Sequence, residues 1–182
     1  QEAYEAAFDI AQRITEGFLI TYTLNALGET FRLTGDLETA NRLIHQAIEQ
    51  AESHRSSYEL GLTTTALGIL SCMQGDTGAA VDCLARAVEL LEQGGAKREG
   101  ARAHLHLANA YFAQRKYRLV SQQLRAVADL GRRLREDQFA VAEGKQLLPL
   151  IKYAVSKRIG DSYFSHVLEK VNALPVVAVR ER

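Results

Sequence analysis

A chain of 182 residues, 47% of them hydrophobic, is long enough to bury roughly 70% of its unfolded surface in one domain or one short repeat array. Its formal net charge is zero, which argues against electrostatic binding to the phosphate groups of a nucleic acid, so no direct nucleic-acid contact is expected. No apolar run approaches the roughly 18 residues that a membrane helix needs, and QEAYEAAFDIAQRI at the amino end is unlike a signal peptide. Two cysteines without a C-x-x-C motif favour a reducing, cytoplasmic location. No contact with a membrane is expected.

An internal repeat organises the chain. Residues 26–40 read ALGETFRLTGDLETA and residues 66–80 read ALGILSCMQGDTGAA, so that a glycine, a Gly-Asp pair and an alanine recur 40 positions later. Apolar residues follow helical spacing and strand alternation is almost absent, which predicts an all-α fold of antiparallel helical hairpins. Gly35 and Gly75 suit the left-handed position that ends a helix, and Asp36 and Asp76 suit the N-cap that begins the next.

The period assigns an element to each part of the chain. Residues 1–14 are predicted to be the second helix of a truncated repeat, and residues 174–182 a tail or the start of a linker. Three regular repeats are predicted between them, the first with helices over 17–34 and 37–52; the repeats cover residues 17–53, 57–93 and 97–134. Residues 137–173 are predicted to be a degenerate capping hairpin, with one helix from 137 to 156 and another from 161 to 173. Pro149 should kink or delay the first of these two helices.

The repeat carries the residues of a known family. Leu27, Gly28 and Phe31 read L-G-x-x-F, and after the Gly-Asp turn Ala40 and Ile44 open the pattern A-x-x-x-I-x-x-A. This resembles the tetratricopeptide repeat, whose usual period is about 34 residues, whereas HEAT and armadillo repeats run to about 40. Small residues at the expected helix crossing favour the tetratricopeptide (TPR) interpretation. The resemblance implies one TPR-like domain over residues 1–173, a right-handed superhelical α-solenoid.

Three longer phrases resemble a narrower group of proteins. FLITYTLNALGE, RLTGDLETANRLIHQAIEQAE and FAVAEGKQLLPLIKYAV are similar to the sensor region of large ATP-dependent transcriptional activators, a group that includes the bacterial maltose regulon activator and the signal-transduction ATPase class. The resemblance implies a non-enzymatic domain for ligand sensing, protein–protein interaction and assembly, with neighbouring ATPase and DNA-binding modules. This chain has no G-x-x-x-x-G-K-[ST] loop. Because it begins with Gln1 and its only methionine is Met73, it is interpreted as part of a longer regulator. The alternative is a free-standing scaffold that binds a partner's peptide.

Enzyme chemistry finds little support in the sequence. His104 and His106 form an H-x-H pair, but residues two apart on a helix point in different directions, so no metal site is expected. Cys72 and Cys83 fall on opposite helices of one hairpin and are expected to be small core thiols. No catalytic residue and no cofactor are therefore assigned.

The candidate site is a second row of side chains on the first helix of each repeat, on the concave side of the expected superhelix. Polar heads on such a wall suit the capture of a peptide or a small inducer, while apolar members of the row are equally suited to packing against the preceding hairpin. The chaperone-type carboxylate clamp is not expected, since its Lys and Asn positions hold Asn25 and Glu29. The candidates are Tyr22, Asn25, Glu29, Thr65, Ile69, Arg102, His106, Asn109 and Phe112.

Charge is unevenly distributed along the chain. Residues 1–60 hold ten acidic residues against four arginines, and residues 97–135 hold ten basic residues against two acidic ones. These segments are either solvated helix faces or the two sides of a head-to-tail contact. Self-association that weakens as salt rises is the expectation from the second interpretation.

Overall fold

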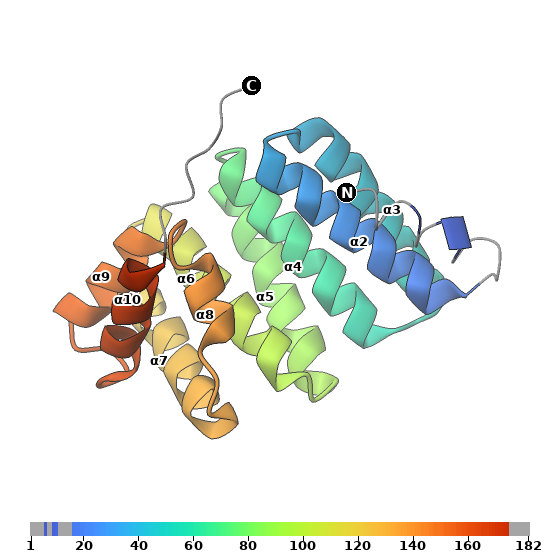
Figure 1. The fold of residues 1–182 in the computed structure, drawn as a ribbon. Coiled ribbons are helices and arrows are strands. Elements are labelled where there is room, and N and C mark those ends of the chain that lie inside the picture. The colour runs from blue at the N-terminus through green and yellow to red at the C-terminus, as the bar shows by residue number, and fades with distance from the viewer. Residues whose placement is uncertain (1–5, 7–8, 11–15, 175–182) are drawn as a thin grey trace.

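The computed structural model describes residues 6, 9–10 and 16–174, and these contain helices and turns but no strand. Nine helices lie within residues 16–174 (Figure 1): α2 Gly17–Thr34, α3 Leu37–Ser53, α4 Ser57–Met73, α5 Thr77–Gln93, α6 Lys97–Ala113, α7 Tyr117–Leu134, α8 Gln138–Glu143, α9 Leu148–Ser156 and α10 Tyr163–Ala173. The all-α prediction is confirmed. The helix expected over residues 1–14 falls mostly outside the described residues, as does nearly all of the expected tail.

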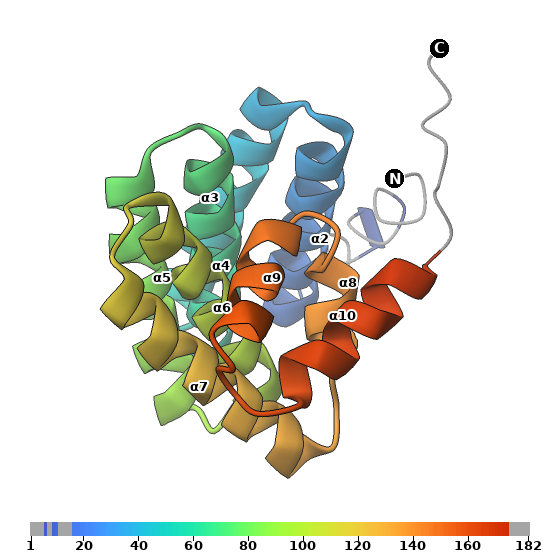
Figure 2. The same cartoon turned by 90° about the vertical axis from the view of Figure 1, so that its left-hand side faces the viewer.

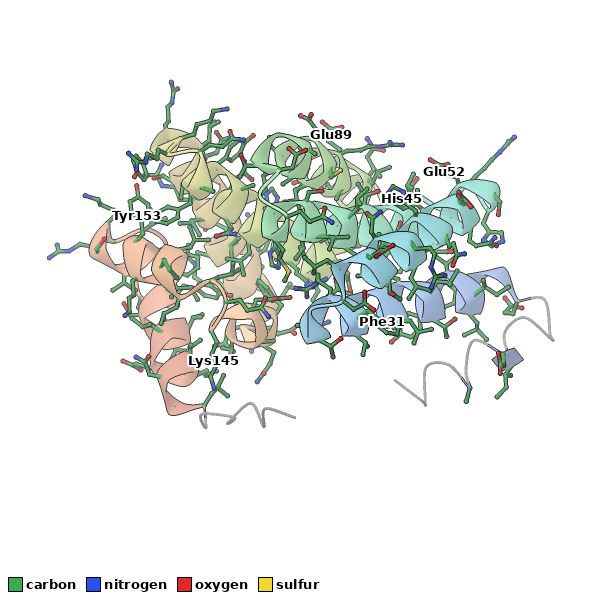
Figure 3. All side chains as sticks on the ribbon, turned by 90° about the horizontal axis from the view of Figure 1, so that it is seen from above. Phe31, His45, Glu52, Glu89, Lys145 and Tyr153 are labelled. Atoms are coloured by element: carbon green, nitrogen blue, oxygen red, sulfur yellow. The ribbon has the colours of Figure 1, made fainter. Side chains whose placement is uncertain are left out.

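Consecutive helices pack as antiparallel hairpins, as the sequence predicts. The closest pairs are α2 with α3, α4 with α5, and α6 with α7. The first helices of the hairpins, α2, α4 and α6, also touch one another in series, whereas no comparable contact joins α3 to α5 or α5 to α7 in the described part of the chain. Seen from above, Glu52 of α3 and Glu89 of α5 project from one long side of the molecule and Phe31 of α2 lies on the other (Figure 3). The first helices therefore form an inner layer and the second helices an outer one.

The turns that follow the six long helices, α2 to α7, share one backbone geometry. A residue with positive φ stands at every twentieth position, and three of the six are arginines: Gly35, Arg55, Gly75, Gly95, Arg115 and Arg135. Asp36 accepts a hydrogen bond from the Thr39 amide at 3.0 Å, and Asp76 accepts one from the Ala79 amide at 2.9 Å. The expected roles of the Gly-Asp turns are confirmed, and each helix with its turn occupies the same length of chain.

Arg115→Gly should raise the free energy of unfolding by about 1 kcal/mol. Arg115 has a φ of 57°, a conformation that costs an L-residue roughly 1–2 kcal/mol and that glycine adopts freely. Thermal unfolding of the variant checks this gain. The matched control is Gly75→Ala, because Gly75 has a φ of 86° and nothing within 4 Å of an added Cβ. Gly75→Ala should lower the free energy of unfolding by a similar amount. Equal melting temperatures for both variants and the parent would contradict the left-handed conformation of these turns.

Small residues set the distance between the two helices of a hairpin. A Cβ added to Gly28 would lie 2.7 Å from Cγ1 of Ile44 and 3.4 Å from the carbonyl oxygen of Ala40. Ala40 and Ile44 are completely buried. In the next hairpin a Cβ on Gly68 would lie 2.5 Å from Cγ of Leu84. The glycine on the first helix thus allows the second helix to approach closely in both hairpins.

The carboxyl-terminal part differs from its prediction. The single helix expected over residues 137–156 is wrong, because α8 ends at Glu143 and α9 begins at Leu148. Pro149 lies in the first turn of α9, where its missing amide hydrogen leaves no helical bond unmade. Gly144 lies so close to Val171 of α10 that a Cβ there would overlap it, so the interruption makes room for the last helix. The short helices α8–α10 contact α6 and α7 and pack across the end of the array (Figure 2).

Candidate functional site

A pocket of about 210 Å³ opens on the inner layer, between α2, α4 and α6. Each of the three successive hairpins contributes to it through its first helix. The lining residues are Phe18, Thr21, Tyr22, Asn25, Tyr58, Glu59, Leu62, Thr63, Arg98, Glu99 and Arg102. The inner face of the array therefore carries a depression that no single hairpin could form alone.

Equivalent positions of the repeat meet in this pocket. Phe18, Tyr58 and Arg98 are 40 residues apart, and so are Tyr22, Leu62 and Arg102. The candidates predicted from the sequence include Tyr22 and Arg102 of the second set and omit the whole of the first set, which lies one helical turn earlier. The 40-residue period could have identified the omitted set, because it places an aromatic, an aromatic and an arginine at one position of the repeat.

Three aromatic side chains form the exposed rim of the pocket. The exposed fractions are 46% for Phe18, 51% for Tyr22 and 37% for Tyr58. The rings of Phe18 and Tyr22 are stacked with centroids 6.4 Å apart. Large apolar surfaces of this kind that stay open to solvent beside polar groups are typical of binding sites.

A charged network lies beside the aromatic rim. Arg102 Nε donates to Glu143 Oε1 of α8 at 2.9 Å, and its Nη2 donates to Glu29 Oε2 of α2 at 3.2 Å. Arg32 Nη2 donates to the same oxygen of Glu29 at 2.8 Å. His106 Nε2 lies 3.5 Å from Glu143 Oε1. Through Arg102 this network joins the first hairpin to the third and to the carboxyl-terminal helices.

The network holds its carboxylates in the charged form. Burial by itself raises the pKa of Glu143, but the interactions with His106 and Arg102 outweigh it and lower the pKa from 4.5 to about 2. Burial likewise raises the pKa of Glu29, and the charges of Arg102 and Arg32 reverse this and lower it. Burial lowers the pKa of His106. All three shifts have the same consequence, because in acid the unfolded chain binds protons that the folded chain does not.

Acid should therefore destabilise the fold through this network. The depressed pKa of Glu143 stabilises the protein fully above about pH 4.5, and this contribution is lost as the pH falls toward about 2. From Glu143 alone we expect the free energy of unfolding to fall by about 2 kcal/mol between pH 5 and pH 3. Urea unfolding at several pH values measures this dependence. Glu143→Gln should make the acid slope shallower, while Glu89→Gln, at an exposed position of α5, should leave it unchanged. A slope that is the same in all three proteins would refute the assignment.

The structure separates the nine candidate residues of the sequence into groups. Tyr22, Asn25 and Arg102 line the pocket, and Glu29 lies beside it in the network. Thr65 is buried and its hydroxyl donates to the carbonyl of Gly61 at 2.7 Å. Two further candidates, Ile69 and His106, are also buried.

The two candidates from the end of α6 lie apart from the pocket lining. Asn109 is half-buried. Phe112 packs on the ring of Tyr153 at 5.3 Å, in a separate aromatic cluster with Tyr117. The row is therefore divided between a pocket, a core and a distant cluster.

Three buried acceptor atoms in and beside the pocket have no hydrogen-bond partner: Asn25 Oδ1, Glu29 Oε1 and Glu59 Oε2. The side chain of Glu59 is only 10% exposed, and the nearest basic group is His54 Nδ1 at 3.8 Å from Oε2. A buried acceptor without a donor costs free energy, so these atoms favour a ligand that supplies donors.

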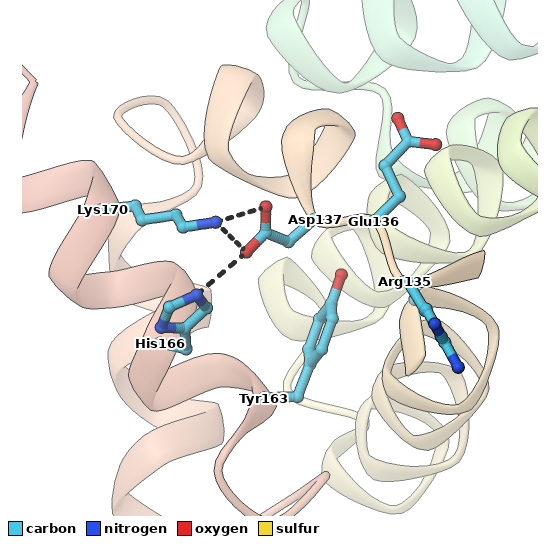
Figure 4. Close-up of a pocket in the computed structure, with 7 residues that line it drawn as sticks. Arg135, Glu136, Asp137, Tyr163, His166 and Lys170 are labelled. Atoms are coloured by element: carbon cyan, nitrogen blue, oxygen red, sulfur yellow. Dashed lines mark hydrogen bonds and ion pairs between the residues drawn. The ribbon is translucent and has the colours of Figure 1, made fainter. Parts of the chain in front are cut away.

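A second pocket of about 260 Å³ lies between the end of α7 and α10 (Figure 4). Asp137 accepts hydrogen bonds from Lys170 Nζ at 2.9 and 2.7 Å, and His166 Nε2 lies 3.6 Å from the same carboxylate. The Tyr163 hydroxyl points toward the side of the pocket that holds Asp137 and Glu136, and burial together with these acids raises its pKa. Both carboxylates of this pocket are matched, Asp137 by Lys170 and Glu136 by Arg98, which makes it the weaker candidate.

In the described part of the chain, no group of three or more His, Cys, Asp or Glu side chains could hold a metal ion, and no helix has the length and the apolar surface to span a membrane. His104 lies 2.6 Å from Gln123 and 3.2 Å from Glu92, so it faces away from His106 and its partner Glu143.

The two cysteines are free and half-buried rather than fully buried core thiols. Burial raises the pKa of Cys72 to about 11, which keeps the thiol protonated at neutral pH. Neither cysteine lines the pocket of the inner layer.

Comparison with protein-family models, with curated proteins and with solved structures finds no significant match to this chain. A proposal for the function of the chain therefore rests on the fold and on the geometry of the pocket.

Proposed function

We propose that this chain is a non-enzymatic binding domain, a right-handed TPR-like α-solenoid that captures a ligand or peptide on its inner layer. One observation carries the proposal: equivalent positions of three successive hairpins line one pocket. In a helical repeat protein each unit adds a strip to a continuous concave surface, and such surfaces serve recognition. The exposed aromatic rim and the unpaired acceptors supply the contacts that a ligand needs.

The lining residues favour binding over catalysis. The hydroxyl of Thr21 donates to the carbonyl of Gly17 at 3.1 Å, and that of Thr63 donates to the carbonyl of Glu59 at 3.0 Å. Neither threonine is hydrogen-bonded to a base that would activate it as a nucleophile. Both arginines of the pocket are held by carboxylates. The side chains of the pocket are therefore suited to binding and orienting a partner rather than to catalysing a reaction on it.

We further propose that the domain senses an inducer or partner and supports assembly within a larger cytoplasmic transcriptional regulator. The support is the resemblance of three sequence phrases to the sensor region of ATP-dependent activators. A helix-turn-helix or a nucleotide-binding loop encoded in the same gene would favour this role. A gene that encodes neither would favour the alternative, a free-standing scaffold for a partner's peptide.

Substitution of the rim should weaken binding without unfolding the protein. Tyr22→Ala combined with Asn25→Ala removes one aromatic face and one polar head, and we expect ligand affinity to fall by about 1–2 kcal/mol. The measurement is the inducer or partner response of the full-length protein, with the melting temperature followed in parallel. Tyr117→Ala is the matched control, since Tyr117 is 47% exposed but lies outside the pocket. A stable double variant that responds like the parent would exclude this pocket as the binding site.

Self-association through the acidic and basic segments is a separate proposal, and the ion pairs bear on it. In the basic segment Arg98 pairs with Glu136, Arg102 with Glu29 and Glu143, and Arg132 with Asp129 and Asp161. These pairs leave less free positive charge for a second molecule than the sequence total suggests. Sedimentation at low and high salt tests whether the remaining positive charge is sufficient for self-association.

A further inference from the structure

The positive charges of the inner pocket are already matched. Arg98 Nε donates to Glu136 Oε1 at 2.6 Å, and Arg102 pairs with Glu29 and Glu143. A guanidinium group held by a carboxylate has little attraction left for an anionic ligand. The arginines of the pocket are therefore structural, and anion capture is not the role they favour.

Among the side chains that line the pocket, the buried atoms without a hydrogen-bond partner are acceptors, whereas in the adjoining network the donor Arg32 Nε also lacks one. Glu59 presents a nearly buried carboxylate with one oxygen unpaired, and Asn25 presents an unpaired carbonyl oxygen in the same lining. Around the pocket five carboxylates face three guanidinium groups: Glu29, Glu59, Glu99, Glu136 and Glu143 against Arg32, Arg98 and Arg102. Two histidines also face these acids, His54 at 3.8 Å from Glu59 and His106 at 3.5 Å from Glu143. The carboxylates in and beside the pocket therefore outnumber the guanidinium groups by two.

The rim adds a second preference for a cation. The faces of aromatic rings attract ammonium groups, and the attraction is greater where water is partly excluded. The exposed rings of Phe18, Tyr22 and Tyr58 line the same pocket as the nearly buried carboxylate of Glu59. A pocket of about 210 Å³ suits a single unbranched chain rather than a drug-sized molecule.

We propose that the pocket between α2, α4 and α6 binds a primary ammonium group on an unbranched alkyl chain, either a lysine side chain of a partner or a free alkylamine. The ammonium donates to Glu59 Oε2 and Asn25 Oδ1, and the alkyl chain lies between the aromatic rings. This inference rests on the proposed binding function and names the ligand class for the same pocket.

Calorimetric titration of the 182-residue chain tests the inference with matched probes. N-acetyl-lysine methylamide should bind at least about tenfold more tightly than its neutral analogue N-acetyl-norleucine methylamide. Glu59→Gln should weaken the lysine derivative by about tenfold and leave the norleucine derivative unchanged. Glu49→Gln, at an exposed position of α3, is the control and should change neither. Tyr22→Leu leaves the buried carboxylate in place and should lower the affinity for the lysine derivative roughly threefold. This variant tests the inference if Glu59→Gln lowers the melting temperature too far for the titration.

The outcomes separate the inference from the function on which it rests. Equal binding of the lysine and norleucine derivatives, or tighter binding of n-butyrate than of n-butylammonium, would overturn the inference and leave a binding pocket of another preference. An absence of binding by all four probes would count against both proposals. If n-butylammonium binds as tightly as the lysine derivative, the source is a free amine; if the lysine derivative binds more tightly, the source is a peptide.

Discussion

Arg102→Met is expected to lower the free energy of unfolding by about 3 kcal/mol. The side chain of Arg102 is 26% exposed and pairs with Glu29 and Glu143, whose own side chains are 18% and 12% exposed. Methionine keeps much of the apolar stem but leaves both carboxylates without their shared partner, and an uncompensated buried charge is costly. Because the two acids lie on α2 and α8, the loss should loosen the first hairpin and the carboxyl-terminal helices together. Chemical denaturation measures the change.

Two further variants make this expectation specific. Glu29→Gln in the Arg102→Met background should recover part of the loss, since it removes one of the stranded charges. Arg98→Met should cost less than about 1 kcal/mol, because the side chain of Arg98 is 55% exposed and its pair with Glu136 is a surface ion pair. If Arg102→Met and Arg98→Met had equal and small effects, the network would not hold the hairpins together.

Gly68→Val is expected to cost about 3 kcal/mol. A Cβ at this position would already lie 2.5 Å from Leu84 Cγ and 3.3 Å from Cys83 Cβ, and valine adds two methyl groups to that overlap. Leu84 is fully buried, so it has no free space into which to move, and the helices α4 and α5 must separate. Thermal unfolding followed by circular dichroism gives the size of the effect.

Gly100→Ala is the matched control in the next hairpin. Gly100 is also a buried glycine of a first helix, but an added Cβ would meet only Leu91 Cβ, at an ordinary distance of 3.9 Å. Alanine there should stabilise α6 by about 0.5–1 kcal/mol through its higher helix propensity. Loss of stability in both variants to the same extent would show that the distance between helices does not explain the glycine at position 68.

The hairpins could be predicted because their signals are local and repeated. Gly35 ends one helix and Asp36 caps the next, and both recur 40 residues later, so the expected helices over 17–34 and 37–52 agree with α2 and α3 to within one residue. The left-handed turns at Arg55 and Arg115 left no such signal, because arginine is not one of the residues that favour a positive φ. Their positions follow only from the spacing of the turns.

The carboxyl-terminal helices could not be predicted in the same way. The pattern of apolar residues around Pro149 suits one long helix, but the chain breaks at residues 144–147 so that α10 can pack against Gly144. The reason for the break lies in a residue near the other end of the hairpin, Val171, and not in the local sequence. Tertiary packing decided the outcome here.

The site was partly predictable for a related reason. The position of Tyr22, Asn25 and Arg102 on the inner layer follows from helical periodicity. The partners of Arg102 do not, because Glu29 and Glu143 lie 73 and 41 residues away in the sequence and come from two other helices. That pairing assigns Arg102 a structural task that a row of polar residues cannot reveal, and it leaves Glu59 as the carboxylate of the pocket with an oxygen that accepts no hydrogen bond.

A binding site shared by three successive helices is tested most directly by an amide NMR titration of the chain with n-butylammonium, n-butyrate and n-butanol. With the ligand that binds, resonances on the inner faces of α2, α4 and α6 should shift together and fit one dissociation constant, with Tyr22, Glu59 and Arg102 among them. The ammonium probe should produce the largest shifts. Shifts confined to a single helix, or shifts on the outer helices α3, α5 and α7 with the pocket unaffected, would contradict a binding site on the inner layer.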